Sequence, residues 1–574
     1  MKKHYSLLLL FIFSLAILQT RAQGVWSAVS TLAPDTNGGG MLLLSDGSVL
    51  VKSSSGGGDG IGSIYNKLTP DIHGSYANGT WSTIAPMYNT RLYYSSDVLR
   101  DGRVYVAGGE YGTGYHSAEI YDPVADSWSL ITSVVDTFED ANSILLPDGT
   151  VLQATLEYKS AFQGDVIYDP VANVYNPVPS CLGQHAEAPW MSLPDNSVLF
   201  CDFETQSSER YIPSLGHWIT DANVPDSLWA YSETGCSLLL PDGRAFFLGG
   251  PHNAYYTPSG NTTAGTWSSA ADMPNGNGQA DAPGAMMIDG QILCIGAPKP
   301  SSDTSIFNWP TSFYVFDYKS NSFTQIAAPA GSDTIEPNYI FNMLDLPDGS
   351  IMLSEMGYSQ YYIYTPSGAP LSQGKPKIDN LTKIDCSTYK LTGKLFNGIS
   401  QGVSYGDDWQ MFTNYPIVRL SSVTGDSIYY CRSYNWNHND VMDSVNEDTV
   451  TFTPPATLPA GTYSLVVVTN GIASSPISFI PCPNGIAEIE NNNVVEISPN
   501  PSSGIFNFQI TSNHQLMANS RIEVYNVLGE KIMTQLSSTT RTTLDLTGQA
   551  SGVYMYKILS ADGNIIANGK LVVE

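Results

Sequence analysis

The stretch SLLLPDGRAFFLGG (residues 237–250) joins two short apolar runs through a Pro-Asp-Gly corner. Proline presets a turn φ, aspartate can bond to nearby backbone, and glycine accepts a positive φ, so the two runs are expected to form a hairpin. Similar stretches occur at 42–51, 97–109, 143–152, 191–200, 286–296 and 344–353. The corner aspartates are Asp46, Asp101, Asp148, Asp195, Asp242, Asp289 and Asp348, and four of the six intervals between them are 47 residues. The chain therefore contains an internal repeat.

Each repeat carries a second signal, an aromatic-rich strand followed by a turn and a lone aromatic, as in AEIYDPVADSWS (118–129). Four short strands per unit with a period in the forties predict a β-propeller blade, and seven corners predict seven blades. The signatures of WD40 blades are absent, so the pattern is kelch-like. The N-terminal stretch GVWSAVSTLAP (24–34) matches the outermost strands at 80–87 and 266–274. We expect it to complete the last blade and so remove a free sheet edge.

The chain ends and the composition indicate an exported protein. Residues 1–22 have a basic start, an apolar run and a small-residue cleavage site, which is typical of a secretory signal. This apolar run is too short to span a bilayer comfortably, and no other run approaches the required length. A net charge of −28, from 53 acidic and 25 basic residues, argues against nucleic acid or anionic membranes as partners. Seven cysteines are an odd, sparse set, and a disulfide such as Cys386–Cys431 is one pairing among several.

We expect the all-β chain to contain three folded parts. Residues 23–372 form the propeller, and short alternating strands over 373–481 suggest an immunoglobulin-like sandwich. An asparagine-rich linker spans 482–495, and 496–574 form a small C-terminal β-sandwich.

The C-terminal part resembles a known export signal. ISPNPSSGIFNFQI, VYNVLGEKI, SGVYMYKI and the terminal GKLVVE are similar, in this order, to the type A C-terminal sorting domain of the type IX secretion system. The resemblance covers 496–574 and implies a protein that reaches the cell exterior or outer surface through the periplasm and uses this domain to engage the secretion machinery.

The propeller followed by a sandwich resembles the architecture of galactose oxidase and glyoxal oxidase over about residues 24–481. That family implies a copper ion at the propeller mouth with two histidines, an axial tyrosine, and a tyrosine cross-linked to cysteine. Counted from the corners, Tyr93 and Tyr339 fall at the two tyrosine positions, but Ile340 stands at a histidine position and Gly38 at the cysteine position. The segment 404–420, which replaces the one bearing the second histidine, contains none. The sequence therefore argues against copper-radical oxidation.

Eight or nine residues before each corner, where first strands begin near the axis, four consecutive repeats place a carboxylate: Asp140, Glu187, Glu233 and Asp281. Crowded carboxylates repel unless one is protonated or a cation sits among them. They suggest either a divalent ion such as calcium or acid–base chemistry on a sugar, with Asp140, Glu187 and Asp281 as catalytic candidates. The alternative is that these acids cap strand ends or are solvated in loops.

Aromatic residues near the same positions are expected to offer faces to a sugar ring: Tyr93, Tyr94, Trp190 and Tyr339. His185, two residues before Glu187, is a further candidate for the mouth. We therefore expect the propeller mouth to bind a carbohydrate or a surface component. The alternatives are a carbohydrate-active oxidase, hydrolase or lyase that uses the acidic rim, and a protein-binding surface component.

Overall fold

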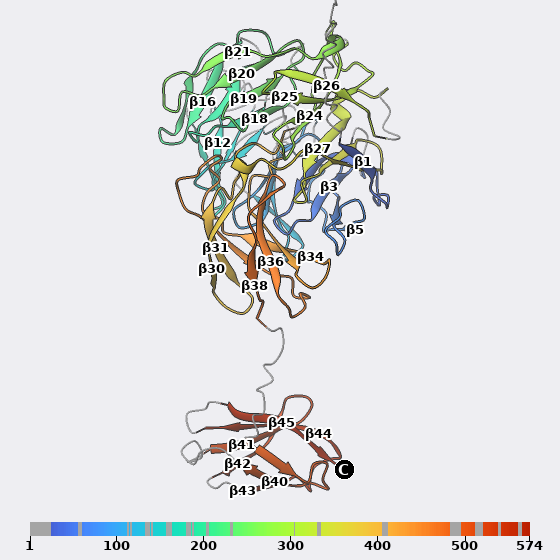
Figure 1. Ribbon diagram of the computed structural model, residues 1–574, viewed down its shortest axis with the longest axis vertical. Coiled ribbons are helices and arrows are strands. Elements are labelled where there is room, and N and C mark those ends of the chain that lie inside the picture. Colours follow the sequence, from blue (N-terminus) through green and yellow to red (C-terminus); the bar gives the residue numbers. More distant parts are fainter. Residues whose placement is uncertain are drawn as a thin grey trace, which may run out of the picture. The chain divides into compact units, whose positions relative to one another are not determined.

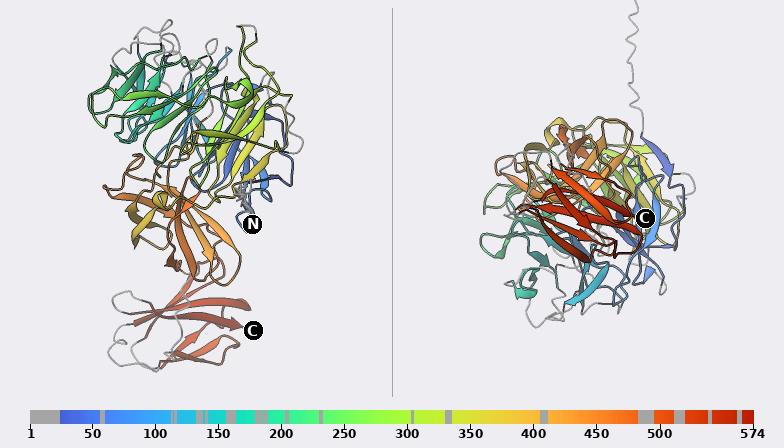
Figure 2. Two further views of the ribbon diagram at one scale, coloured as in Figure 1. Left: turned by 45° about the horizontal axis from the view of Figure 1, so that its top comes forward. Right: turned by 90° about the horizontal axis from the view of Figure 1, so that it is seen from below.

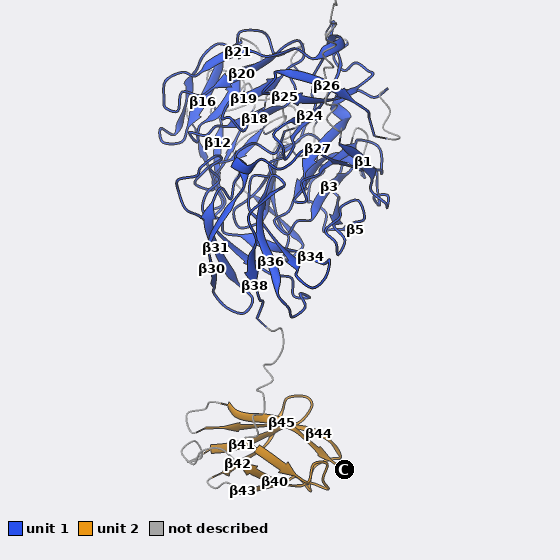
Figure 3. Cartoon of the chain, in the orientation of Figure 1, with its two compact units in different colours: residues 1–482 blue, residues 483–574 orange. Residues whose placement is uncertain are grey.

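The computed structural model describes residues 24–55, 60–111, 114, 117–131, 138, 142–155, 164–178, 185, 189–202, 206–229, 233–302, 305–329, 335–404, 411–482, 495–510, 520–537, 541–560 and 565–574. The expected signal segment and most of the expected linker lie outside these ranges. The chain divides into two compact units, residues 1–482 and 483–574 (Figure 3). The described residues contain no α-helix, only the short 3-10 turns η3 (Pro274–Gly276), η4 (Asn338–Ile340) and η5 (Ser372–Gly374). No helix among them is long and apolar enough to cross a membrane.

Seven antiparallel sheets follow one another along the first unit, each built on four strands in the repeating order, and the sixth carries two further short strands (Figure 1). The first four are β2 (Asn37–Leu43), β3 (Val49–Ser53), β4 (Tyr65–Thr69), β5 (Thr80–Thr83); β6 (Ser95–Val98), β7 (Val104–Ala107), β8 (Ala118–Asp122), β9 (Ser127–Ile131); β10 (Ser143–Leu145), β11 (Val151–Gln153), β12 (Val166–Asp169), β13 (Val174–Pro177); and β14 (Met191–Ser192), β15 (Val198–Cys201), β16 (Ser208–Ile212), β17 (His217–Thr220). The other three are β18 (Ser237–Leu239), β19 (Ala245–Leu248), β20 (Asn253–Thr257), β21 (Thr266–Ser269); β23 (Gly284–Met286), β24 (Ile292–Pro298), β25 (Ser312–Asp317), β26 (Ser322–Ile326), with β22 (Asn277–Gly278) on β24; and β27 (Phe341–Asp345), β28 (Ile351–Glu355), β29 (Tyr362–Thr365), β1 (Val25–Ala28).

The corner between the first and second strand of each sheet has the chemistry that the repeat predicts. Oδ1 of every corner aspartate accepts the backbone N–H two residues on, at 2.9–3.1 Å. The residue between them has a positive φ in all seven corners, from 67° at Asn196 to 92° at Gly149. The corner prediction is confirmed, and it explains why asparagine, which tolerates this region, is the one substitute for glycine.

The second strands are buried at nearly every position, whereas the fourth strands are mostly exposed. A second strand is covered on both faces by neighbouring sheets, which accounts for its continuous apolar sequence. The resulting arrangement of sheets around an axis is seen in Figure 2.

The N-terminal strand closes the ring. β1 pairs antiparallel with β29 as the outermost strand of the last sheet. The Trp26 ring packs against Phe313 and Tyr364, at 5.6 and 4.8 Å between centroids, and its indole N–H donates to the Ala327 carbonyl at 2.9 Å. First strands β2 and β27 of the first and last sheets are in contact. The predicted closure is confirmed.

A further antiparallel sheet, here called the appended sheet, completes the first unit. It runs in the order β30-β31-β35-β34-β33-β36-β37, with β38 also on β36. Its strands are β30 (Lys377–Lys383), β31 (Tyr389–Lys394), β33 (Ile417–Ser422), β34 (Ile428–Tyr434), β35 (Asp448–Thr453), β36 (Tyr463–Thr469), β37 (Ile472–Ala473) and β38 (Ile477–Phe479). The intervening β32 (Val403–Ser404) pairs instead with β23 of the sixth propeller sheet. The chain thus returns from the appended sheet to the propeller.

The second unit has its own core, which includes Phe506, Ile522, Leu544 and Tyr556. One sheet has the order β39-β40-β43 and the other β42-β41-β44-β45. The strands are β39 (Val495–Ser498), β40 (Ile505–Ile510), β41 (Ser520–Tyr525), β42 (Lys531–Ser537), β43 (Arg541–Asp545), β44 (Gly552–Leu559) and β45 (Ile565–Val573).

Candidate functional site

The two ends of the propeller differ in what covers them. The corner end lies against the appended sheet: a side chain on Gly47 would meet the Tyr430 ring at 2.6 Å, and the Ser433 N–H donates to the Ser45 carbonyl at 3.0 Å. Because strands alternate in direction, the opposite end carries the segments before each first strand and the loops between second and third strands. We call this opposite end the mouth.

The described carboxylates of the expected site lie at the mouth on neighbouring sheets. Glu233 precedes β18 and Asp281 precedes β23, and both are half-buried. The Asp281 N–H donates to the Thr234 carbonyl at 2.7 Å, which ties the two segments together. Asp140 and Glu187 lie outside the described residues, so the structure tests neither the four-carboxylate cluster nor its proposed calcium.

Tyr93 is held at the mouth in an uncommon backbone conformation. Its φ is 43°, a region that a bulky residue rarely adopts and that costs of the order of 1–3 kcal/mol. Neighbouring Arg91 and Leu92 are fully buried, and the Arg91 guanidinium pairs with the buried Glu119 at 2.9 Å, so the segment is anchored on one side. The half-buried Tyr93 ring meets the Tyr111 ring edge-on at 6.4 Å.

The exposed aromatic side chains gather at this end. Throughout the described part of the chain, the aromatic residues with large exposed fractions are Tyr88 (66%), Tyr111 (67%), Trp309 (63%) and Tyr358 (45%). Tyr88 lies between β5 and β6, and the other three lie between a second and a third strand, so all four belong to mouth loops. The spacing from the corners does not predict them; the signal in the sequence was an aromatic residue in the loops that follow β7, β24 and β28.

Three residues expected at the mouth are core residues instead. Trp190 is fully buried, and Tyr94, which is 3% exposed, hydrogen-bonds to Tyr65. His185 is also fully buried, with Nδ1 2.7 Å from an Asp165 carboxylate oxygen. The expectation that these rings face a ligand is therefore wrong: Trp190 and His185 contact Trp218 of the same sheet, and Tyr94 bonds to a tyrosine of the first sheet.

Tyr339 stays half-buried in η4, with its ring 4.9 Å from that of Phe307.

Two positions of a copper–radical site, those of a histidine and of the cross-linked cysteine, do not carry its ligands. Ile340 is buried and offers no donor atom. A Cβ on Gly38 would lie 2.7 Å from the Ser53 carbonyl group, so the cysteine position has no room for a side chain. Within the described ranges, no three His, Cys, Asp or Glu side chains come together in a way that could hold a metal ion.

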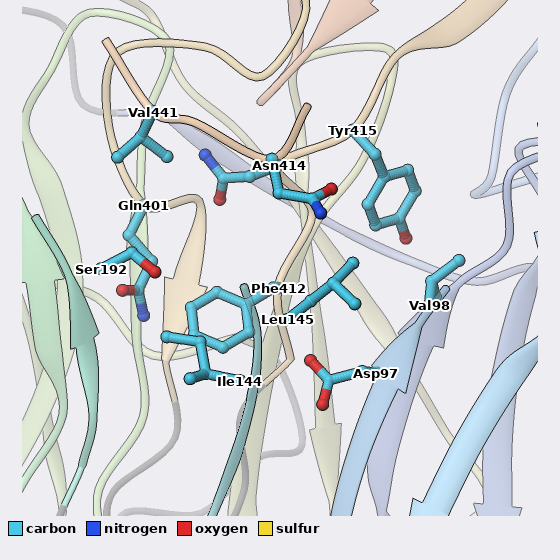
Figure 4. A pocket seen from close by; sticks show the side chains of 11 residues that line it. Asp97, Val98, Ile144, Leu145, Ser192, Gln401, Phe412, Asn414, Tyr415 and Val441 are labelled. Carbon is cyan, nitrogen blue, oxygen red and sulfur yellow. The ribbon is translucent and has the colours of Figure 1, made fainter. Parts of the chain in front are cut away.

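A cavity of about 40 Å³ lies at the inner, corner end of the propeller. Its walls are the ends of β6, β10 and β14, together with residues of the chain segment that returns to the propeller, Gln401, Phe412, Asn414 and Tyr415 (Figure 4). The volume has room for about three water molecules. Gln401 Oε1 is buried and accepts no hydrogen bond from the described residues, so the cavity offers it as a free acceptor.

Asp97 supplies the acid group of this cavity (Figure 4). Ser143 donates to its carboxylate at 2.6 Å. Burial nevertheless raises the pKa of Asp97 to about 6, since hydrogen bonds from Ser143 and the Leu145 backbone offset only part of the desolvation. The sequence signal that could have pointed to this buried acid is a single carboxylate inside an otherwise uncharged strand, β6.

Asp345 is a second buried acid, on β27. Neither of its oxygens accepts a hydrogen bond from a described group, and burial raises its pKa well above the ordinary value. With Thr413 and Asn470 it lines a cavity of about 10 Å³, which is the size of one water molecule. Desolvation therefore disfavours the charged form of this carboxyl.

Comparison with known proteins finds two family models. Residues 496–574 match the secretion system C-terminal sorting domain, and residues 91–134 match the kelch motif. No curated protein matches the chain significantly.

Similar solved structures include a fungal alcohol oxidase of the AA5 family in complex with copper, with 16% identity, a TM-score of 0.48, and coverage of 80% of this chain and all of that one. A streptogramin B lyase has 12% identity, a TM-score of 0.42, and coverage of 60% and 98%. A virginiamycin B lyase from Staphylococcus aureus has 10% identity, a TM-score of 0.43, and coverage of 60% and 99%.

The first part of the chain is a kelch-type propeller by three observations: its corners, its successive sheets and the kelch match at 91–134. The sorting-domain match covers the last part, 496–574. The protein is a kelch-type β-propeller that carries a type IX secretion sorting domain and is exported to the cell exterior or surface.

Proposed function

We propose that the propeller is a binding module that takes a neutral carbohydrate at its mouth. The observation that carries the proposal is the gathering of the exposed aromatic side chains in loops at that end. Exposed apolar groups that gather on one part of a surface mark binding sites, and the face of an aromatic ring packs well on the C–H face of a sugar ring.

The polar groups of the mouth support the same ligand class. Glu233 and Asp281 are partly accessible carboxylates held on adjacent segments, and a carboxylate accepts strong hydrogen bonds from sugar hydroxyls. The strained backbone of Tyr93 preorganises a third contact beside Tyr111. The chain's net charge of −28 disfavours anionic sugars.

Copper-radical oxidation is not part of the proposal. Its chemistry needs imidazole ligands and a tyrosine–cysteine cross-link, and soft or imidazole donors are what copper prefers. Ile340 and the crowded Gly38 occupy two of those positions.

The test is a glycan-array screen of the exported protein, followed by calorimetric titration with the best sugar, with and without EDTA. The double variant Tyr111→Ala/Trp309→Ala is expected to weaken binding by roughly a hundredfold, about tenfold for each lost ring. Tyr434→Ala, on the appended sheet, is the matched control and should leave the affinity unchanged.

The polar contribution is tested with Glu233→Gln/Asp281→Asn, which keeps the shape of both side chains and removes their charge. We expect weaker binding with an unchanged fold. Saturable binding that both mouth variants leave intact would refute the site, and no binding to any sugar would refute the ligand class. Sugar turnover abolished by Glu233→Gln/Asp281→Asn would replace the binding module with an enzyme.

A further inference from the structure

Cys386 and Cys482 are brought together at the C-terminal edge of the first unit. Cys386 lies in the turn between β30 and β31, which is closed by the Ile384 N–H donating to the Thr388 carbonyl at 2.9 Å. The Cys482 N–H donates to the Tyr389 hydroxyl at 3.0 Å, so the last described residue of this unit is tied to the same hairpin. The Cys386 thiol is within hydrogen-bonding contact of the Cys482 sulfur.

The surroundings of this pair differ from those of the other described cysteines. Cys201, Cys236, Cys294 and Cys431 are buried, and burial raises the pKa of each thiol. Cys386 is exposed and Cys482 is half-buried. The Cys386–Cys431 pairing considered from the sequence is not supported, because Cys431 is enclosed in the core while Cys386 faces solvent.

Lys383 adds a positive charge to the pair. The hydrogen bond with Cys386 is the largest cause of the lowered pKa of Cys482, and a hydrogen bond from the Lys383 ammonium group to the Cys482 sulfur is the second. A lowered pKa increases the thiolate fraction, and the thiolate is the form that attacks disulfides.

We propose that Cys386 and Cys482 form a disulfide during export. The Cys482 thiolate attacks the disulfide of an oxidising protein, which gives a mixed disulfide and releases one thiol of the oxidant. The Cys386 thiolate then attacks the Cys482 sulfur and releases the second thiol. The pair loses two electrons and two protons, and the oxidant, a protein disulfide of the kind found in oxidising compartments, gains them.

The bond has a structural role at the boundary with the sorting domain. It connects the first hairpin of the appended sheet to the segment after β38, immediately before the chain enters residues 483–494. A cross-link that closes so long a loop strongly restricts the unfolded chain. The disulfide holds the end of the first unit in place whether the sorting domain remains attached or is removed.

The test uses the protein exported by its own host, alkylated under denaturing conditions without reductant and analysed by peptide mass spectrometry. We expect a cross-linked peptide pair containing Cys386 and Cys482, 2 Da lighter than the two reduced peptides, with Cys201, Cys236, Cys294 and Cys431 alkylated. Cys386→Ser is expected to leave Cys482 open to alkylation, and Cys482→Ser is expected to do the same for Cys386. Alkylation of both cysteines in the unmodified protein, or a cross-link from either one to Cys181, would overturn the proposal.

A second measurement reports on the role of the bond in the folded protein. Reduction, or the Cys386→Ser/Cys482→Ser variant, is expected to raise hydrogen exchange in β38 by roughly tenfold or more, with β19 unchanged. Unchanged exchange in β38 would refute the role assigned to the bond.

Discussion

Arg210 is expected to contribute far more to the stability of the folded protein than Arg244, whose ion pair lies at the corner of the fifth sheet. Its guanidinium is fully buried, with Nε 2.5 Å from the Asp221 carboxylate and Nη1 3.1 Å from that of Asp195. Nη2 donates to the Asn261 and Thr263 carbonyls at 3.0 and 2.6 Å, and these belong to the next sheet. Arg210 therefore joins the fourth and fifth sheets, and its ion pair with Asp221 is fully buried.

Arg210→Met removes the charge and leaves Asp221 buried. Losing one partner of a buried pair costs about 3–5 kcal/mol. Asp221 keeps backbone N–H donors from Ala222 and Gly265 on its other oxygen, at 2.7 and 2.9 Å, so we expect the low end, about 3 kcal/mol. Arg244→Met is the matched control: its pair with Asp242 is partly exposed, and we expect a loss of about 0–1 kcal/mol.

The assay is native-state hydrogen exchange of the β16 and β17 amides. A loss of about 3 kcal/mol raises the opening equilibrium by roughly a hundredfold. Arg210→Met/Asp221→Leu should recover part of the loss, because an apolar pair of similar volume replaces a buried ion pair at little cost. Equal effects of Arg210→Met and Arg244→Met would refute the reasoning.

Two other predictions concern single positions of the propeller. Asp97 has a pKa of about 6 in the folded protein against an ordinary value of 3.8, so its carboxyl binds more protons in the folded than in the unfolded state between these values. Its contribution to stability is expected to fall as pH rises from about 4 to 6 and then to level off. Asp97→Asn should flatten this part of the plot of the urea unfolding midpoint against pH. A smaller slope will remain, because the pKa of Asp448 is also raised to about 6. A slope that Asp97→Asn leaves unchanged would contradict the prediction. Gly38→Ala places a Cβ 2.7 Å from the Ser53 backbone and should cost about 1–3 kcal/mol in urea unfolding, whereas Gly425→Ala, whose Cβ would meet nothing closer than 3.8 Å, should cost little. Equal midpoints for these two alanine variants would show that the backbone at residue 38 can yield.

The repeat explains why so much of the architecture could be predicted. In a β-propeller the first two strands of each sheet pair across a short corner. A motif in contiguous residues therefore predicts strand pairing, and its repetition predicts the succession of sheets. The corner of SLLLPDGRAFF (237–247) has the predicted glycine φ and aspartate bond, and the match of 24–34 to outermost strands correctly placed β1 on β29. The position of Tyr93 before a first strand also follows from counting back from a corner.

The repeat did not predict which aromatic side chains are buried or which residues contact them. Trp190 and Tyr111 are both aromatic residues near a mouth loop, yet Trp190 is fully buried and Tyr111 is 67% exposed. Spacing along the chain does not show which neighbouring blade covers a side chain, because that contact comes from a strand dozens of residues away.

The sequence by itself determined the repeat, its corners, the closing strand and the sorting domain, since each is encoded in contiguous residues with a period or a motif. The tertiary structure alone decided that exposed aromatics gather at one end, that Asp97 lines a cavity, and that Cys386 meets Cys482 and not Cys431. These properties depend on packing between separate sheets, where burial sets both the exposure of a ring and the pKa of an acid.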